Sequence, residues 1–306
     1  MISAKVAFAP IHDGRYELTP FPSCLKAVSA YLGRKTDYHT LLGASGAAFR
    51  MVWHKQRWEG GNVDIMRMAP DPLEPACRAL DAAGMAGEFL MRRTATHGLL
   101  PEAARRAFLA PYETDDDAEI KARIVRSVDA GIPVIAFGDV GPPEACVVSG
   151  YDDGGDTLIG WSMFQEHLDP AHDLTGATAD ELNPPSGMEP DGTFRRDDWA
   201  RRTLGIVALE QRPPADLDPV YRRALAWIPT ILKGAQVYDS HTGRAAYDAY
   251  LAHLGDEAEF AADDLPTLAI RKMVHYDAMT MIAERSSGAQ FVRDIAARDA
   301  FTACRA

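Results

Sequence analysis

Residues 141–161 have the sequence GPPEACVVSGYDDGGDTLIGW. Two short apolar runs, Ala145–Ser149 and Thr157–Trp161, flank the turn-forming residues DDGG at 152–155, which predicts two strands joined by a tight turn. A third apolar run, Ile132–Phe137, comes shortly before them. The strands cluster and do not alternate with helices, so the sequence favours an α+β fold with an antiparallel sheet.

The rest of the first half adds elements around these strands. We expect strands at Lys5–Ile11 and Leu204–Leu209, a helix that begins at Cys24 after a capping Ser23 and ends at Gly33, and helices over 71–84 and 116–130. Residues 166–193 are rich in Pro, Gly and Asp and have no period, which is typical of a functional lid or a disordered loop.

After Pro213 the chain becomes rich in alanine and shows helical spacing almost to its end. We expect helices at Val220–Leu232, Arg244–Leu254 and Pro266–Ala303, the last with a break near residues 286–288. The sequence therefore predicts an α+β domain over residues 1–212 and an all-helical region over 213–306 that packs on it.

Composition and charge exclude several classes of partner. The 306 residues carry 32 basic and 44 acidic side chains, and the net charge of −12 repels nucleic acid and anionic lipid. No apolar run of about 18 residues could span a membrane, and the first residues lack a signal-peptide pattern. The four cysteines are far apart, so we expect reduced thiols and a cytoplasmic location.

Strong motifs for cofactors and metals are absent from the sequence. It contains no phosphate-binding loop, no GxGxxG, no HExxH, no GxSxG and no paired CxxC. Its nine histidines are scattered and do not have the local spacing of metal ligands. We therefore expect no metal site and no cofactor.

Cys24 is the candidate nucleophile. It follows a Pro-rich turn and opens a predicted helix, where the helix dipole and unpaired backbone N–H groups would favour a thiolate and stabilise an oxyanion. The alternative is a small buried apolar side chain, since free cysteine is among the most buried residue types.

Other candidate site residues lie on the predicted strand pair. Glu144 and Cys146 have the same parity at the start of a strand, so we expect both side chains on one face. If that face is internal, the pKa of Glu144 is raised; if Glu144 ends the strand, it is solvated. Trp161, Ser162 and Gln165 end the next strand and could line a cleft, although an aromatic residue there is also typical of a core.

Acidic residues interrupt an apolar stripe on the last predicted helix. Asp277 and Glu284 share a face with Met281. Acids in such a position are costly unless they are paired or functional. Two explanations are open: salt bridges to Arg271 and Arg285, or a helix that covers a cleft and supplies Asp277 or Glu284 to a ligand.

The order of these features resembles a known family. A helix-initiating cysteine, more than a hundred further residues, and an apolar strand that ends in Gly-Tyr-Asp-Asp before a Gly-Gly turn are similar to the papain-like cysteine fold. The version is that of bacteriocin-processing peptidases and of the N-terminal domain of butirosin biosynthesis protein H. Residues 41–49, LLGASGAAF, resemble the Gly-rich turn of butirosin-type proteins, which also carry a helical C-terminal part. The resemblance covers residues 5–210.

The chain departs from the papain-like pattern in its catalytic residues. Glu144 stands where the family has its histidine, Trp161 and Ser162 stand where it has the orienting acid, and no suitable glutamine precedes Cys24. A carboxylate beside Cys24 would raise the thiol pKa, whereas a protonated Glu144 could act as a general acid or hydrogen-bond donor. Three histidines come from other segments: His54, His241 and His275.

Two hypotheses for the function follow. As the resemblance implies, the protein could transfer an acyl group to a small molecule, or cleave an amide or ester, with Cys24 as nucleophile and Glu144 as an atypical proton-transfer partner. Alternatively, it is a catalytically inactive pseudo-enzyme that binds a metabolite, peptide or protein partner in the same cleft. In the first hypothesis, the loop 166–193 and the C-terminal helices would shape the substrate pocket.

We also predict a homo-oligomer that forms through an apolar face on residues 220–303, because this region is rich in Ala and Met. Light scattering of the purified chain should give the mass of at least two copies. A monomeric mass would contradict this prediction.

Overall fold

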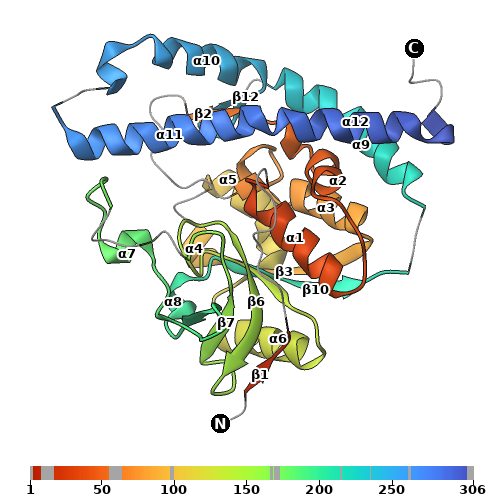
Figure 1. Ribbon diagram of the computed structural model, residues 1–306, viewed down its shortest axis with the longest axis vertical. Helices are drawn as coiled ribbons and strands as arrows, with labels where there is room; N and C mark the ends of the chain where they lie inside the picture. Colours follow the sequence, from red (N-terminus) through yellow and green to blue (C-terminus); the bar gives the residue numbers. More distant parts are fainter. Residues whose placement is uncertain are drawn as a thin grey trace.

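A mostly antiparallel sheet runs through the N-terminal part of the computed structural model (Figure 1). The structure describes residues 3–7, 17–54, 64–96, 100–165, 168, 173–213, 216–234, 236–260 and 263–301. Within them the strand order is β4-β3-β10-β5-β6-β7-β9-β8, with β1 beside β6, and β3 with β4 is the parallel pair. The strands are β1 (Ala4–Lys5), β3 (Met85–Arg92), β4 (Glu113–Thr114), β5 (Val134–Phe137), β6 (Ala145–Asp152), β7 (Thr157–Trp161), β8 (Gly187–Met188), β9 (Phe194–Arg196) and β10 (Gly205–Gln211).

The strand pair predicted from residues 141–161 is confirmed. β6 and β7 are antiparallel, with Val147 opposite Trp161 and Asp152 opposite Thr157. Residues 153–155 all have positive φ, and two of the three are glycines, which adopt this conformation without a steric cost. β5 pairs with the other edge of β6, and β10 pairs with β5. The turn residues between β6 and β7 therefore determine how these two central strands pair.

Helices cover both faces of this sheet. One face packs against α1 (Pro20–Tyr31), α2 (Tyr38–Ala44) and α3 (Glu74–Ala83), and the other packs against α6 (Asp117–Asp129). Phe21 of α1 stacks on Phe137 of β5 with ring centroids 6.0 Å apart. Shorter helical elements connect these parts: η1 (Ala47–Phe49), η2 (Asp64–Arg67), α4 (Arg93–Thr96), α5 (Glu102–Ala104), the π-helix η3 (Arg105–Leu109), η4 (Ala110–Tyr112), α7 (Ala179–Leu182) and α8 (Trp199–Arg202).

The C-terminal part is helical apart from two short strands. Its elements are α9 (Asp218–Lys233), β11 (Gln236–Val237), β12 (Ser240–Thr242), α10 (Arg244–Leu254), η5 (Glu257–Phe260), α11 (Leu265–Ala283) and α12 (Arg285–Ala297). The expectation of an all-helical region is wrong in one respect, because β12 pairs with β2 (Val52–His54) of the N-terminal part. Figure 1 shows α11 and α12 end to end above α1 and α2, with α10 beside α11.

Several predicted boundaries differ from the observed ones. The helix expected from Cys24 begins at Pro20, because prolines are well tolerated in the first turn and Thr19 takes the N-cap position. The last helix breaks at Glu284 and not near residues 286–288. The region 166–193 contains α7 and β8, while part of it, like residues 8–11 of the first expected strand, lies outside the described residues. No helix in the described ranges is both long and apolar enough to cross a membrane.

Close packing of α2 against α12 fixes the C-terminal helices on the N-terminal part. Gly43 of α2 lies directly under the ring of Phe291, so that a Cβ at Gly43 would overlap it. In return, a Cβ at Gly288 of α12 would come within 2.9 Å of the Phe49 ring. Glycine at these two positions therefore allows the helices to approach each other closely.

We predict that Gly43→Ala destabilises the fold by about 1–3 kcal/mol, the usual cost of overpacking a filled core. Urea denaturation would measure it. Gly187→Ala is the matched control, because a Cβ there meets no atom within 4 Å. Equal stability of the two variants would show that α2 and α12 do not pack as described.

Candidate functional site

The amino end of α1 has few free N–H groups. Two of its first three residues are prolines, which have no N–H to donate. The N–H of Phe21 donates to Asp64 Oδ2 at 2.6 Å, and that of Ser23 contacts the carbonyl of Thr19 at 3.3 Å. The predicted oxyanion site beside Cys24 is therefore not formed by free N–H groups of this turn.

Cys24 lies one turn inside α1 and is fully buried, at 0% exposure, in the main apolar core. Burial raises the pKa of its thiol well above the ordinary value, and nearby Asp64 raises it further. The prediction of a thiolate at a helix start is thus wrong on both counts, because the helix begins earlier and the thiol is desolvated. The position matches the alternative of a small buried apolar side chain.

Four carboxyl groups, from η2, from the residue before β6, and from α11 and its C-cap, are within electrostatic reach of one another. They are Asp64, Glu144, Asp277 and Glu284, and we call them the acid cluster. Burial raises the pKa of Glu144 well above its usual range, and Asp64, Asp277 and Glu284 all add to this increase. The predicted site residues Glu144, Asp277 and Glu284 are therefore brought within electrostatic reach of one another.

Two further members of the acid cluster have perturbed pKa values. Burial raises the pKa of Asp64 to about 7, against the opposing effect of Arg50 and of the Phe21 and Ala145 amides. Burial also raises the pKa of Asp277 to about 6, again opposed by Arg50. At neutral pH these carboxyl groups are therefore partly protonated.

Glu284 is the most completely bonded member of the acid cluster. Its oxygens accept hydrogen bonds from the Thr19 hydroxyl, at 2.8 Å each, and from the Tyr38 hydroxyl. Arg50 Nη1 lies 3.2 Å from Glu284 Oε2, and both side chains are almost fully buried. Arg50 also donates to the Ala47 carbonyl and to Thr19 Oγ1. Glu284 thus joins the C-terminal helices to the ends of α1 and α2.

The other three carboxyl groups have weaker partners. Asp64 is 4% exposed, and its Oδ1 has no hydrogen-bond partner among the described residues. Arg285 does not reach them: its guanidinium donates to the carbonyls of Ala48 and Arg50 and to the Tyr247 hydroxyl. The cluster therefore holds more carboxyl groups than its neighbouring cation could balance if all were ionised.

The salt bridges proposed for the last helix are not the ones observed. Arg271 pairs with Glu259 at 3.0 Å, and His275 Nε2 lies 3.2 Å from the same carboxylate. Neither Arg271 nor Arg285 therefore pairs with Asp277 or Glu284, as the structural explanation required. Glu284 is nevertheless paired, with Arg50, so the salt-bridge explanation holds for it with a different arginine. The ligand explanation stays a prediction for Asp277.

Glu144 and Cys146 do not share a face, contrary to the parity prediction. β6 begins at Ala145, so Glu144 lies outside the regular alternation of the strand. Cys146 is buried in the core on the α6 side, with its Sγ 3.9 Å from Asp139 Oδ2. Burial and Asp139 raise the pKa of its thiol well above the usual value. Cys146 is therefore separate from the acid cluster.

Ser162 and Gln165 hold the chain after β7 in place. The Ser162 hydroxyl donates to the Val140 carbonyl at 3.3 Å, and its N–H donates to Gln165 Oε1 at 2.9 Å. The Gln165 amide donates to the Gly192 carbonyl at 2.6 Å. Trp161 packs against the core, and its buried Nε1 has no acceptor in the described part of the chain. Ser162 and Gln165 thus have structural partners and do not lie free in a cleft.

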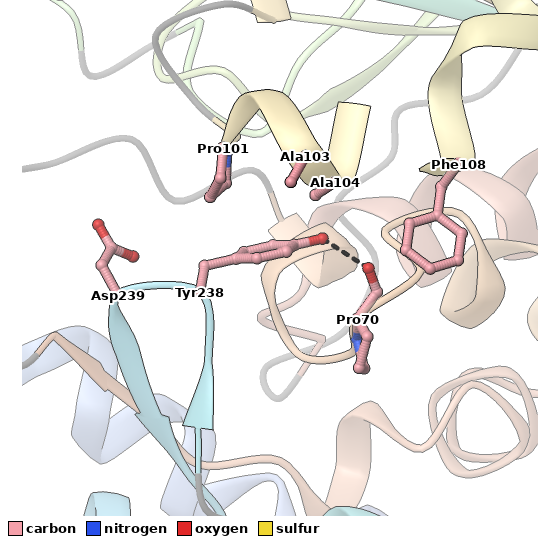
Figure 2. A pocket seen from close by; sticks show the side chains of 7 residues that line it. All are labelled: Pro70, Pro101, Ala103, Ala104, Phe108, Tyr238 and Asp239. Atoms are coloured by element: carbon pink, nitrogen blue, oxygen red, sulfur yellow. Dashed lines mark hydrogen bonds between the residues drawn. The ribbon is translucent and has the colours of Figure 1, made fainter. Parts of the chain in front are cut away.

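A separate apolar depression of about 590 Å³ shares no residue with the acid cluster. Figure 2 shows Tyr238 lying across it, with its hydroxyl donating to the Pro70 carbonyl at 2.8 Å. Asp239 lies at its edge, paired with Arg67 at 2.6 Å and with His54 at 3.1 Å. The remaining lining residues are Pro101, Ala103, Ala104 and Phe108. The His54 side chain is therefore paired with an acid at the edge of this depression.

Sequence reasoning missed Asp64, Arg50, Thr19 and Tyr38. Thr19 carried a signal, since threonine before a proline is typical of a helix N-cap. Asp64 has φ of +52°, a conformation in which Asp is enriched among non-glycine residues, but a single Asp does not reveal it. Tyr38 and Arg50 reach the site through long-range packing, which has no local signature.

Among the described residues, no three His, Cys, Asp or Glu side chains are arranged to hold a metal ion. No protein-family model matches the chain, and no curated protein or solved structure is significantly similar to it.

We predict that Asp277→Asn stabilises the protein at pH 8 by about 1–3 kcal/mol. The folded pKa of Asp277 is raised from 3.8 to about 6, so the fold favours the protonated form. Stability from this group is complete below pH 3.8 and is lost as pH rises through 6. The gain from the uncharged variant should therefore disappear near pH 4.

Urea denaturation at both pH values would measure this difference. Asp248→Asn, which removes an exposed acid of α10, is the control and should change stability little at either pH. A gain for Asp277→Asn that is independent of pH would mean that its charge is not the cause.

Proposed function

We propose that this protein binds a small-molecule ligand at the acid cluster without covalent chemistry at Cys24. In this proposal it is a pseudo-enzyme with a papain-like fold. The proposal rests on a difference in solvent exposure between Cys24 and two residues of the acid cluster. The Cys24 thiol has 0% exposure in the core, whereas Glu144 and Asp277 are residues of intermediate exposure.

The unfilled hydrogen-bonding capacity of the acid cluster supports a binding function. Buried polar groups in folded proteins are nearly always hydrogen-bonded, so an exception requires an explanation. Asp64 Oδ1 is such an exception in the described chain. A ligand that donates to this oxygen would supply the missing interaction.

The papain-like part of the proposal rests on sequence resemblance and on topology. α1 carries Cys24 and packs against β5 and β6, with Phe21 stacked on Phe137. Glu144 comes directly before β6, at the position where the resemblance places a histidine. In this proposal, α1 and β6 correspond to the helix and strand of a papain-like thiol enzyme, with carboxyl groups in place of its other catalytic residues.

The catalytic alternative is acyl transfer or hydrolysis with Cys24 as nucleophile and Glu144 as proton-transfer partner. It requires a thiolate that substrate can reach. Burial and the neighbouring Asp64 both disfavour the thiolate. We therefore favour binding over catalysis.

A thermal-shift screen of metabolites with three proteins would test the proposal. A ligand that stabilises the wild type should stabilise Cys24→Ala by the same shift, because the thiol does not touch it. The same ligand should lose most of its shift with Glu144→Gln, which removes a carboxyl group from the acid cluster. Loss of the shift in Cys24→Ala alone would contradict the proposal.

Alkylation by iodoacetamide at pH 7 is the control for thiol chemistry. Peptide mapping should show that Cys24 reacts more slowly than free cysteine, because its thiol is buried and protonated. Faster alkylation of Cys24 would support the catalytic alternative.

A further inference from the structure

We propose that the apolar depression beside Tyr238 binds a neutral, planar aromatic ring that carries a hydrogen-bond donor at its edge. This depression shares no residue with the acid cluster, so the inference does not rest on the proposed function. Its size and position, the irregular backbone of two of its walls, the shape of its lining and the polar atoms at its edge all support such a ligand.

The depression has the size and the position of a small-molecule site. Its volume is about 590 Å³, within the usual range of about 300–1,000 Å³ for ligand pockets. It lies between the N-terminal part, which supplies Pro70, Pro101, Ala104 and Phe108, and the β11–β12 hairpin, which supplies Tyr238 (Figure 2). Ligand sites occur preferentially where two structural units meet in this way.

The backbone of Tyr238 is in an unfavourable conformation. Tyr238 and Asp239 form the turn between β11 and β12, in which Val237 pairs with Ser240. Tyr238 has a φ of +54°, at a position where Gly, Asn or Asp is usual because larger side chains are rarely accommodated there. Residues held in such conformations are concentrated at ligand sites, so the strain indicates a role for the Tyr238 ring beyond the turn.

A second wall of the depression is also irregular. Phe108 belongs to the π-helix η3, and π-helical turns are rare and frequently found at functional sites. Arg105 and Leu109 of this turn are buried, and Arg105 is held by Glu102 and Glu113. Phe108 is only half-buried, and Figure 2 shows its ring at the depression. The π-helix is therefore anchored by its other residues and leaves this ring to line the depression.

The shape of the lining favours a flat ring. Figure 2 shows Pro101, Ala103 and Ala104 facing the ring of Tyr238, with the ring of Phe108 beside them. An aromatic ligand could stack on Tyr238 and contact these small apolar side chains with its other face. Aromatic pairs gain attraction in stacked or edge-to-face contacts beyond the burial of their area. An aliphatic ligand would fill the same space without this gain.

The polar side-chain atoms at the depression are acceptors. The Tyr238 hydroxyl donates its proton to the Pro70 carbonyl at 2.8 Å, so its oxygen can only accept a further hydrogen bond. The carboxylate of Asp239 is also an acceptor, and Pro70 and Pro101 have no N–H to donate. We therefore expect the ligand to bring the donor.

The charges at the edge of the depression balance one another. The Asp239 carboxylate pairs with Arg67 at 2.6 Å and lies 3.1 Å from His54 Nε2. Its charge is thus already offset, and the other lining side chains are uncharged. A ligand with a formal charge would lose hydration against this apolar lining and would have to compete with an existing ion pair. The lining therefore favours a neutral ligand.

Isothermal titration calorimetry of the full chain with indole would test this proposal, because indole is a neutral planar ring with one N–H donor. We expect saturable binding of one indole per chain. 1-Methylindole keeps the ring but lacks the donor, and indole-3-acetate adds a negative charge, so each should bind at least fivefold more weakly. No saturable binding of indole, or equal affinity for either of these two compounds, would overturn the proposal.

Matched variants locate the site. Ala103→Trp places a large side chain in the depression from an exposed position of α5 and should weaken indole binding at least tenfold. Tyr238→Gly removes the stacking ring at a position whose φ suits glycine and should weaken binding to the same extent. Tyr276→Ala, which removes an exposed tyrosine of α11, is the control and should change the affinity less than twofold.

Far-ultraviolet circular dichroism of each variant confirms that it is folded. If Tyr238→Gly does not fold, Ala103→Trp still decides, because its side chain is added at an exposed position. Unchanged indole affinity in folded Ala103→Trp would overturn the proposal.

This proposal and the proposed function can fail separately. Glu144→Gln should bind indole as tightly as the wild type, because Glu144 does not line the depression. Loss of indole binding in Glu144→Gln, with none in Ala103→Trp, would place indole at the acid cluster; the second site would then be wrong and the proposed function supported. Loss in Ala103→Trp alone supports the second site, whatever the metabolite screen shows for the acid cluster.

Discussion

One buried carboxylate, that of Glu284, joins the C-terminal helices to the N-terminal part of the chain. It lies at the junction of α11 and α12 and accepts hydrogen bonds from Thr19 and Tyr38, which begin α1 and α2. Arg50, which also belongs to the N-terminal part, forms an ion pair with the Glu284 carboxylate. A buried ion pair is stabilising only when its remaining donors and acceptors are satisfied, and here they are. Glu284 thus fixes the C-terminal helices on the ends of the N-terminal ones.

This arrangement determines the electrostatics of the neighbouring acids. Because Arg50 is held by Glu284 and Thr19, its charge is only partly available to Asp64, Glu144 and Asp277. Desolvation then outweighs attraction, and the pKa values of these three groups rise. The protein therefore loses some stability as pH increases through neutrality. Such a cost is typical of sites that are arranged for function and not for folding alone.

Local chemistry explains which features could be predicted from the sequence. The turn at 152–155 and the apolar runs around it fix β6 and β7, and the acids on the apolar stripe of α11 indicated Asp277 and Glu284 as unusual. The parity argument for Glu144 failed because a residue just before a strand does not follow its alternation. Asp64 and Arg50 were missed because only long-range packing brings them to the site.

The position of Asp64 explains why Cys24 lies in an environment so unlike that of a nucleophile. The free N–H at the amino end of a helix attracts negative charge, and in this chain the carboxylate of Asp64 occupies that position on Phe21. The same carboxylate raises the pKa of the Cys24 thiol one turn further along. A thiolate and the Asp64 carboxylate would compete for one positive helix end. With that end already taken by an acid, the positive end of α1 is not available to stabilise a Cys24 thiolate.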